Sequence, residues 1–188
     1  MNTLRLFTLF SGSLLLRISW LLSIGLLAFA PVALRATDTP SLPAGRYTLD
    51  RASLRTFEEA LAKAARQVPA MQRKTALRRL RERLDPPAEI VIGSSEAGWA
   101  LRLGDNPFPP LQPGAAPLSW SGKDGQKAQV SLRWRDNQLE QSVDSGDRAR
   151  LNVFSFDPAE KVLRVEIQFH GSQLRQPGAF TLRYIPAS

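Results

Sequence analysis

The sequence contains no cysteine and only one histidine, His170. The lack of cysteine excludes disulfides, thiolate catalysis, Cys-type zinc or iron–sulfur sites, and the acylated cysteine of a lipoprotein. A metal site would have to be built from carboxylates, and His170 follows an alternating segment, where we expect a surface residue. The sequence therefore predicts neither a metal site nor a cofactor.

Catalytic motifs are also missing. The chain contains no G-x-S-x-G, P-loop or G-x-G-x-x-G pattern. Glu140 and Glu166 could form an acid–base pair, but both occupy the polar face of an alternating strand, where a solvated carboxylate is expected. Asp144 and Asp147 flank a Ser-Gly pair, a composition typical of a β-turn rather than a calcium loop. We therefore expect no catalytic residues and a protein that is not an enzyme.

Acidic residues are absent from the first 36 positions, whereas Arg5, Arg17 and Arg35 lie there. This segment predicts a signal peptide or an N-terminal membrane anchor. The apolar run at residues 18–34 is about the minimum length of a spanning helix, so both alternatives stay open. We expect an exported protein, periplasmic or extracellular, either free or tethered to the inner membrane by residues 18–34.

The remaining composition is typical of one globular domain that is rich in turns. The chain of 188 residues is 43% hydrophobic and 22% charged, with 14 prolines and 12 glycines. Residues 37–44 are interpreted as a linker, and residues 45–188 as a single β domain. Within it, residues 53–84 form a predicted helical insert, with leucines at helical spacing and Pro86 at its end.

From Ala88 onward, apolar residues recur at every second position. Together with a short segment at residues 45–50, these runs predict about eight strands. Close turn signals favour antiparallel neighbours in a meander. The predicted fold is α+β and mainly β, with two N-terminal helices packed on a barrel-like or sandwich-like sheet. The proline-rich segment 106–117 is expected to be a surface loop without regular structure.

Two groups of residues are candidates for binding. The first comprises aromatic residues of the predicted strands, which either line a cavity for a small apolar ligand or fill the core: Trp99, Trp134, Phe154, Phe156 and Phe169. The second comprises arginines of the second helix, which either contact an anionic membrane or polymer or solvate that helix: Arg73, Arg78, Arg79, Arg81 and Arg83. Nucleic acid is not an expected partner of an exported protein, and no oligomeric state is predicted.

The order of these segments resembles a known family. A Gly45-Arg46-Tyr47 first strand, a helical insert and an antiparallel meander are similar to lipocalin-like, calycin-type proteins. The segment from Asp144 through Phe169, with the ending Leu182-Arg183-Tyr184, resembles small exported bacterial proteins of that type. The resemblance implies a binding module of the cell envelope for a small apolar or amphiphilic molecule.

Overall fold

The computed structural model describes residues 42–122, 125–172 and 174–187. The predicted leader at residues 1–36 and most of the predicted linker lie outside these ranges. The described residues form two α-helices, α1 (Leu54–Ala65) and α2 (Arg73–Leu84), each preceded by a short 3-10 turn, η1 (Arg51–Ser53) and η2 (Ala70–Gln72). The strands of the described part are β1 (Gly45–Leu49), β2 (Glu89–Ser95), β3 (Gly98–Leu103), β4 (Asn106–Pro107), β5 (Leu118–Ser121), β6 (Lys127–Arg135), β7 (Gln138–Asp144), β8 (Arg148–Asp157), β9 (Val162–Gly171) and β10 (Gly178–Pro186).

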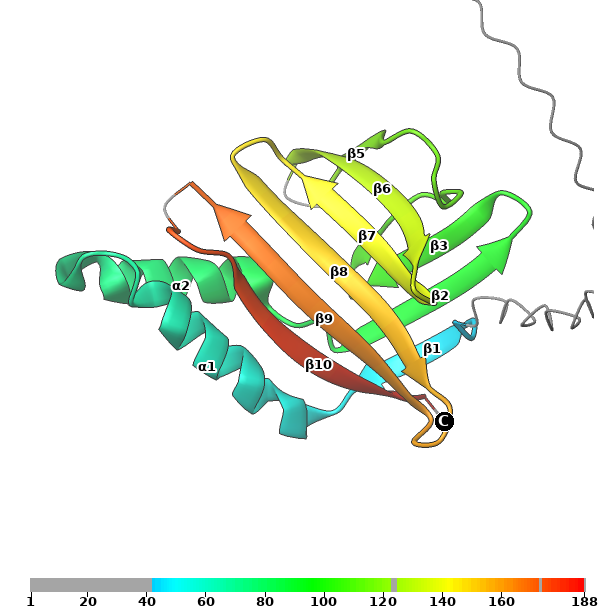
Figure 1. Ribbon diagram of the computed structural model, residues 1–188, viewed down its shortest axis with the longest axis horizontal. Coiled ribbons are helices and arrows are strands. Elements are labelled where there is room, and N and C mark those ends of the chain that lie inside the picture. Colours follow the sequence, from blue (N-terminus) through cyan, green and yellow to red (C-terminus); the bar gives the residue numbers. More distant parts are fainter. Residues whose placement is uncertain (1–41, 123–124, 173, 188) are drawn as a thin grey trace, which may run out of the picture. The chain divides into compact units, whose positions relative to one another are not determined.

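All strands belong to one sheet in the order β4-β3-β2-β1-β10-β9-β8-β7-β6-β5, and the assigned neighbours are antiparallel. The first strand therefore pairs with the last, which places the N-terminal and C-terminal strands side by side in the middle of the sheet. Figure 1 shows this sheet curled into a half-barrel. The structure thus confirms the antiparallel meander, and of the two predicted arrangements it has the barrel-like one.

The prediction of about eight strands was wrong, because two short edge strands were missed. They are β4, at the start of the proline-rich segment, and β5, just after it. Pro107 lacks an N–H group, which an edge strand tolerates because one side of its backbone forms no ladder. The expectation of a featureless surface loop at 106–117 was also wrong, because Phe108 and Leu111 are buried in the core.

The two edges of the curled sheet meet through side chains. The ring of Phe108, just after β4, stacks on Trp120 of β5 at 4.5 Å between centroids. The indole N–H of Trp120 donates to the carbonyl oxygen of Pro107 at 2.9 Å. In a second aromatic contact, Trp99 of β3 packs edge-on against Trp134 of β6 at 5.4 Å between centroids. This seam between β4 and β5 is therefore closed by aromatic contacts rather than by an assigned strand ladder.

Helix α1 covers an edge that β1 leaves open. Strand β1 pairs with β10 only as far as Leu49, opposite Tyr184. Beyond that point the chain turns into α1, and the Thr56 hydroxyl donates to the carbonyl oxygen of Thr181 at 2.7 Å. Phe57 packs against Phe180 at 5.1 Å between centroids. The helix thereby covers this edge of β10 and satisfies the carbonyl group of Thr181.

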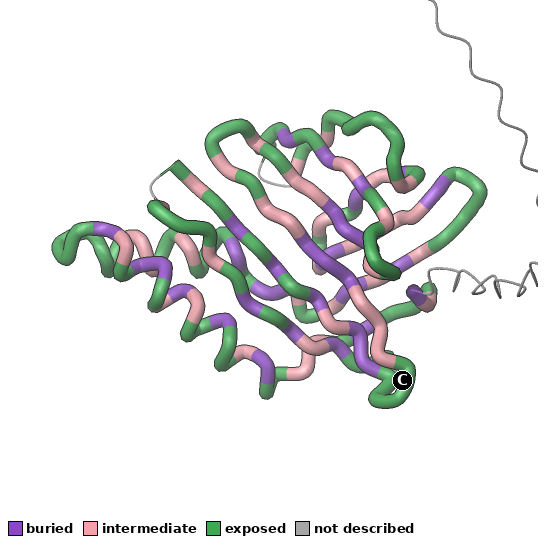
Figure 2. Tube along the Cα trace, in the orientation of Figure 1, coloured by how far each residue is buried: buried purple, intermediate pink, exposed green. Residues whose placement is uncertain are grey.

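The two predicted helices are present as α1 and α2, and α1 ends before Pro69 as proline requires. Neither α1 nor α2 is long and apolar enough to cross a membrane, and the same holds for the short helices of the described ranges. Along the strands, buried and exposed residues alternate (Figure 2), which is the period that the sequence predicted.

Candidate functional site: an open cavity between α2 and the sheet

A cavity of about 950 Å³ lies between α2 and the inner face of the sheet. Its walls come from α2, the segment that follows it, the β4–β5 seam, and the ends of β7, β8 and β9. Exposed residues such as Arg79 and Asp147 line it, so it opens to the surface. This volume is within the range of small-molecule sites.

One side of the cavity is apolar. Leu80 and Leu84 contribute from α2, and Phe169 contributes from β9. Phe108 and Trp120 add the aromatic pair that closes the seam. These side chains can cover a short hydrocarbon chain or a ring.

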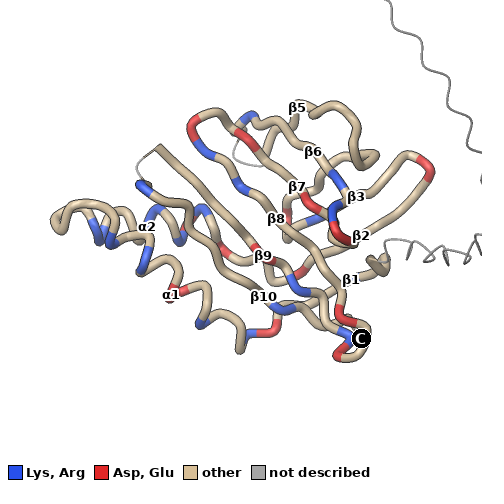
Figure 3. Tube along the Cα trace, in the orientation of Figure 1, with Lys and Arg blue, Asp and Glu red and all other residues tan. Residues whose placement is uncertain are grey.

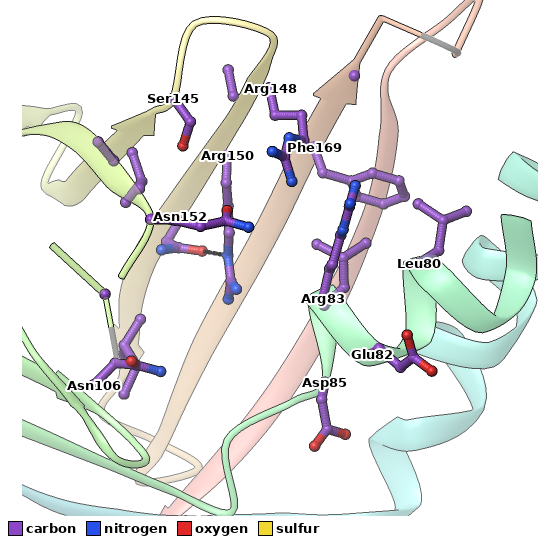
Figure 4. Close-up of a pocket in the computed structure, with 18 of the residues that line it drawn as sticks. Leu80, Glu82, Arg83, Asp85, Asn106, Ser145, Arg148, Arg150, Asn152 and Phe169 are labelled. Carbon is purple, nitrogen blue, oxygen red and sulfur yellow. Dashed lines mark hydrogen bonds between the residues drawn. The ribbon is translucent and has the colours of Figure 1, made fainter. Parts of the chain in front are cut away.

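The opposite side is polar, and its central residue is Arg150 of β8. Strand β8 changes character along its inner face: Arg148, Arg150 and Asn152 lie toward the cavity, and Phe154 lies in the closed core. Arg150 Nε donates to Asn152 Oδ1 at 2.7 Å. Within the described residues no ion pair involves Arg150, and its two terminal nitrogens form no hydrogen bond. Figure 4 shows Arg150 from the sheet and Arg83 from α2 extending into the same space.

Burial lowers the pKa of Arg150 to about 10, while the nearby Tyr184 hydroxyl acts in the opposite direction. Burial likewise raises the pKa of Tyr184, whose hydroxyl donates to the Pro87 carbonyl oxygen at 3.0 Å. At neutral pH Arg150 is still a cation. A partly buried cation that lacks an acidic partner is unfavourable by itself, and an anion bound in the cavity would offset that cost.

Some of the other charged residues around the cavity have partners on the protein. Arg148 Nε lies 3.1 Å from the Asp147 carboxylate. Glu82 pairs with Arg78 at 3.8 Å. Arg79 and Arg83 also line the cavity and form no ion pair among the described residues, but both are exposed on α2, whereas Arg150 is the partly buried cation of the sheet side.

The structure brings only one of the predicted aromatic residues to the cavity. Phe169 lines it. Phe154 is fully buried in the core, and Phe156 packs beside it against Tyr47 at 6.4 Å. Trp99 and Trp134 contact each other and do not line the cavity. Ligand binding by these residues stays a prediction, with Phe169 the one that the cavity can present to a ligand.

The five arginines of the second helix point in different directions. Arg79 and Arg83 line the cavity. Arg81 instead forms an ion pair with Glu58 of α1 at 2.5 Å, which raises the pKa of Arg81. Arg78 pairs with Glu82, and Arg73 donates to the Val68 carbonyl oxygen at 3.4 Å. They do not form a single binding surface, although their contact with anionic partners stays a prediction.

The remaining titratable candidates from the sequence are Glu140, Glu166 and His170. Glu140 forms an ion pair with Arg133, and Glu166 accepts from Gln168 at 2.9 Å, both on the outer face of the sheet. His170 is exposed at the rim of the cavity. Among the described residues, no three His, Asp or Glu side chains come together as a metal site would require.

Sequence reasoning missed Arg150 and Asn152 as site residues, although a signal was present. Both share the inner face of β8 with Phe154, since every second residue of a strand points to the same side. A cation and an amide in line with buried aromatic residues indicate a polar patch inside a fold.

No family model matches the chain, and no curated protein matches it in sequence. Among solved structures, the chain is similar to the REP1-NXSQ fatty acid transporter, with a TM-score of 0.47, 13% identity, and coverage of 77% of this chain and 96% of that one. It is also similar to Echinococcus granulosus fatty-acid-binding protein 1, with a TM-score of 0.48, 7% identity, and coverage of 77% and 97%. For human cRBP IV the TM-score is 0.42, the identity 13%, and the coverage 79% and 100%. All three TM-scores lie below 0.5, so the likeness of this chain to these structures is a weak one.

Proposed function

We propose that this protein is a non-enzymatic binding protein for a small amphiphilic molecule with an anionic head. The ligand occupies the cavity between α2 and the sheet, with its apolar part against Leu80 and Phe169 and its head against Arg150. The observation that carries the proposal is the partly buried Arg150, which faces an open cavity and has no acidic partner among the described residues.

The mixed polar and apolar lining of the cavity favours an amphiphilic ligand over a wholly apolar one. An apolar ligand would leave the guanidinium of Arg150 desolvated and unpaired, which is unfavourable. A carboxylate or similar head would receive charge-assisted hydrogen bonds from it. The apolar side contributes by removing hydrocarbon from water.

Native mass spectrometry with a cavity-filling variant tests the proposal. Ala76 is partly buried on α2 and lines the cavity, whereas its neighbour Thr75 is exposed. We expect the protein to form a 1:1 adduct with decanoate, Ala76→Trp to weaken it at least about tenfold, and Thr75→Trp to leave it unchanged. A failure of the wild-type protein to bind any amphiphile, or equal binding by both variants, contradicts the proposal.

We further propose that the protein acts outside the cytoplasm. The support is the sequence of residues 1–36, which combines apolar residues with arginines and lacks acidic residues. Fractionation of cells and sequencing of the mature N-terminus test this. A new N-terminus within residues 28–37 indicates cleavage, an intact N-terminus in the membrane fraction indicates an anchor, and an intact cytoplasmic protein contradicts export.

A second candidate function is contact with an anionic membrane through the tip of the helix pair. Met71, in the turn between α1 and α2, is 97% exposed. No acidic residue occurs between Leu61 and Arg81, and Figure 3 shows basic residues gathered along α2. An exposed apolar side chain surrounded by cations favours an anionic lipid surface.

Vesicle flotation tests this candidate. We expect binding to vesicles of phosphatidylglycerol but not of phosphatidylcholine, with loss of binding at high salt. Met71→Asp should reduce it, whereas Leu118→Asp, at another exposed apolar residue, should not. Equal binding by both variants contradicts the assignment of the tip.

A further inference from the structure

The inner ends of β7 and β8 carry a chain of three polar side chains that crosses the floor of the cavity. Arg150 Nε donates to Asn152 Oδ1 at 2.7 Å, and Asn152 Nδ2 donates to Gln141 Oε1 at 2.8 Å. Asn152 is 1% exposed and Gln141 is fully buried. Gln141 and Asn152 face each other across the two strands, so the backbone register holds both amides in place.

These hydrogen bonds determine which nitrogen atoms of Arg150 are available to bind a ligand. A guanidinium binds a two-oxygen anion either side-on, through Nε and one terminal nitrogen, or end-on, through both terminal nitrogens. The Nε–H group of Arg150 already donates a hydrogen bond to Asn152 Oδ1. Only the end-on pair is left, and both of its nitrogens lack a hydrogen-bond partner among the residues described.

We propose that Asn152 is a positioning residue that commits Arg150 to end-on recognition of a flat, two-oxygen head such as a carboxylate. Gln141 supports it by accepting from the Asn152 amide and so fixing which way that amide faces. The inference rests on the proposed function, because it concerns how the same cavity selects its ligand. It adds a second residue on which the preference for a charged head over a neutral one of equal length depends, and that residue does not itself carry charge.

The substitution Asn152→Asp separates this role from a structural one. The two side chains have nearly the same shape, but an aspartate beside Arg150 supplies the anion that the ligand would otherwise bring. Gln141 can adapt to the new carboxylate, because its Nε2 has no partner and a turn of its amide directs that nitrogen toward residue 152. We therefore expect the variant to fold.

The experiment compares decanoate with 1-decanol by calorimetric titration of the full-length protein, together with thermal unfolding. The wild-type protein should bind decanoate at least about tenfold more tightly than 1-decanol, since hydrogen bonds to a charged group contribute this much. Asn152→Asp should reduce this ratio to less than about threefold while the 1-decanol affinity changes little. The matched control is Asn137→Asp, in an exposed turn with φ of 63° that aspartate also tolerates, and it should keep the wild-type ratio.

The outcomes are distinct for the two proposals. A wild-type ratio in Asn152→Asp, or an equal loss of both ligands, overturns the positioning role and leaves the binding function in place. Equal affinity of the wild-type protein for the two ligands overturns the selection of a charged head. Failure of the wild-type protein to bind either ligand overturns the proposed function itself, and the inference with it.

Discussion

The ring of Phe169 occupies the space next to the α-carbon of Gly178, its partner across β9 and β10. A Cβ atom at position 178 would lie 2.1 Å from Phe169 Cζ. Phe169 also lines the cavity. The lack of a side chain at position 178 therefore allows this aromatic wall to take its observed place.

Gly178→Ala should displace the Phe169 ring and lower the free energy of unfolding by about 1–3 kcal/mol, as overpacking does. Decanoate binding should weaken as well, because the wall of the cavity moves. Chemical denaturation measures the first effect and calorimetry the second. Gly45→Ala is the control, because its Cβ atom would meet Tyr47 at an ordinary 3.6 Å. A loss of stability as large in the control would show that the Phe169 contact is not the cause.

The pH dependence of anion binding should follow the charge of Arg150. Because burial lowers its pKa to about 10, the residue is charged below that pH and loses its proton as the pH rises through it. We expect the affinity for 1-anilinonaphthalene-8-sulfonate, whose sulfonate stays ionised throughout, to be constant near pH 7–9 and to fall above about pH 10. Fluorescence titration measures it. In Arg150→Met the affinity should be low and flat with pH, and a wild-type decline in that variant would assign the effect to another group.

The hydrogen bond of Trp120 at the seam between β4 and β5 should contribute to the stability of the fold. Trp120→Phe removes the donor to Pro107 and should lower the free energy of unfolding by about 0.5–1.5 kcal/mol beyond the loss of ring area. Trp134→Phe is the control, because Trp134 is also partly buried but its indole N–H has no hydrogen-bond partner among the described residues. This variant therefore measures the effect of the lost ring area alone. Equal losses in the two variants would contradict a role for this hydrogen bond.

The contact between α1 and β10 should be less stable in Thr56→Val. The hydroxyl of Thr56 lies 2.7 Å from the Thr181 carbonyl oxygen, and valine retains the shape of the side chain but not the donor. We expect a loss of about 1 kcal/mol in unfolding experiments and faster hydrogen exchange in β10. Thr75→Val, at an exposed position of α2, should change both measurements little. Unchanged exchange in β10 of Thr56→Val would mean that other contacts hold the helix.

The sequence was sufficient for the elements whose pattern is long and regular. Alternation over residues 127–135 and 163–169 predicted β6 and β9, because one face of each strand is buried and the other is solvated. The helical insert followed from leucine spacing and from Pro86 at its end. Strands β4 and β5 were missed because they are short, lie at edges and adjoin prolines, where alternation carries no signal.

The cavity was beyond sequence reasoning because it depends on where α2 lies relative to the sheet. The sequence could partly predict which arginines of α2 share a face. Arg79 and Arg83 are four residues apart on one face, and Arg81 lies on another. The pairing of Arg81 with Glu58 depends on how the two helices pack. The isolation of Arg150 from acidic partners depends on strand register, which fixes Val143 and Phe169 as its neighbours.

The central claim, that Arg150 binds the anionic head of a ligand in this cavity, is tested most directly by calorimetric titration of Arg150→Met with decanoate and 1-decanol. We predict that the substitution weakens decanoate binding at least about tenfold and changes 1-decanol binding by less than about threefold. Arg135→Met, at an exposed arginine paired with Asp136, should match the wild-type protein for both ligands. Unchanged decanoate affinity in Arg150→Met would contradict the claim.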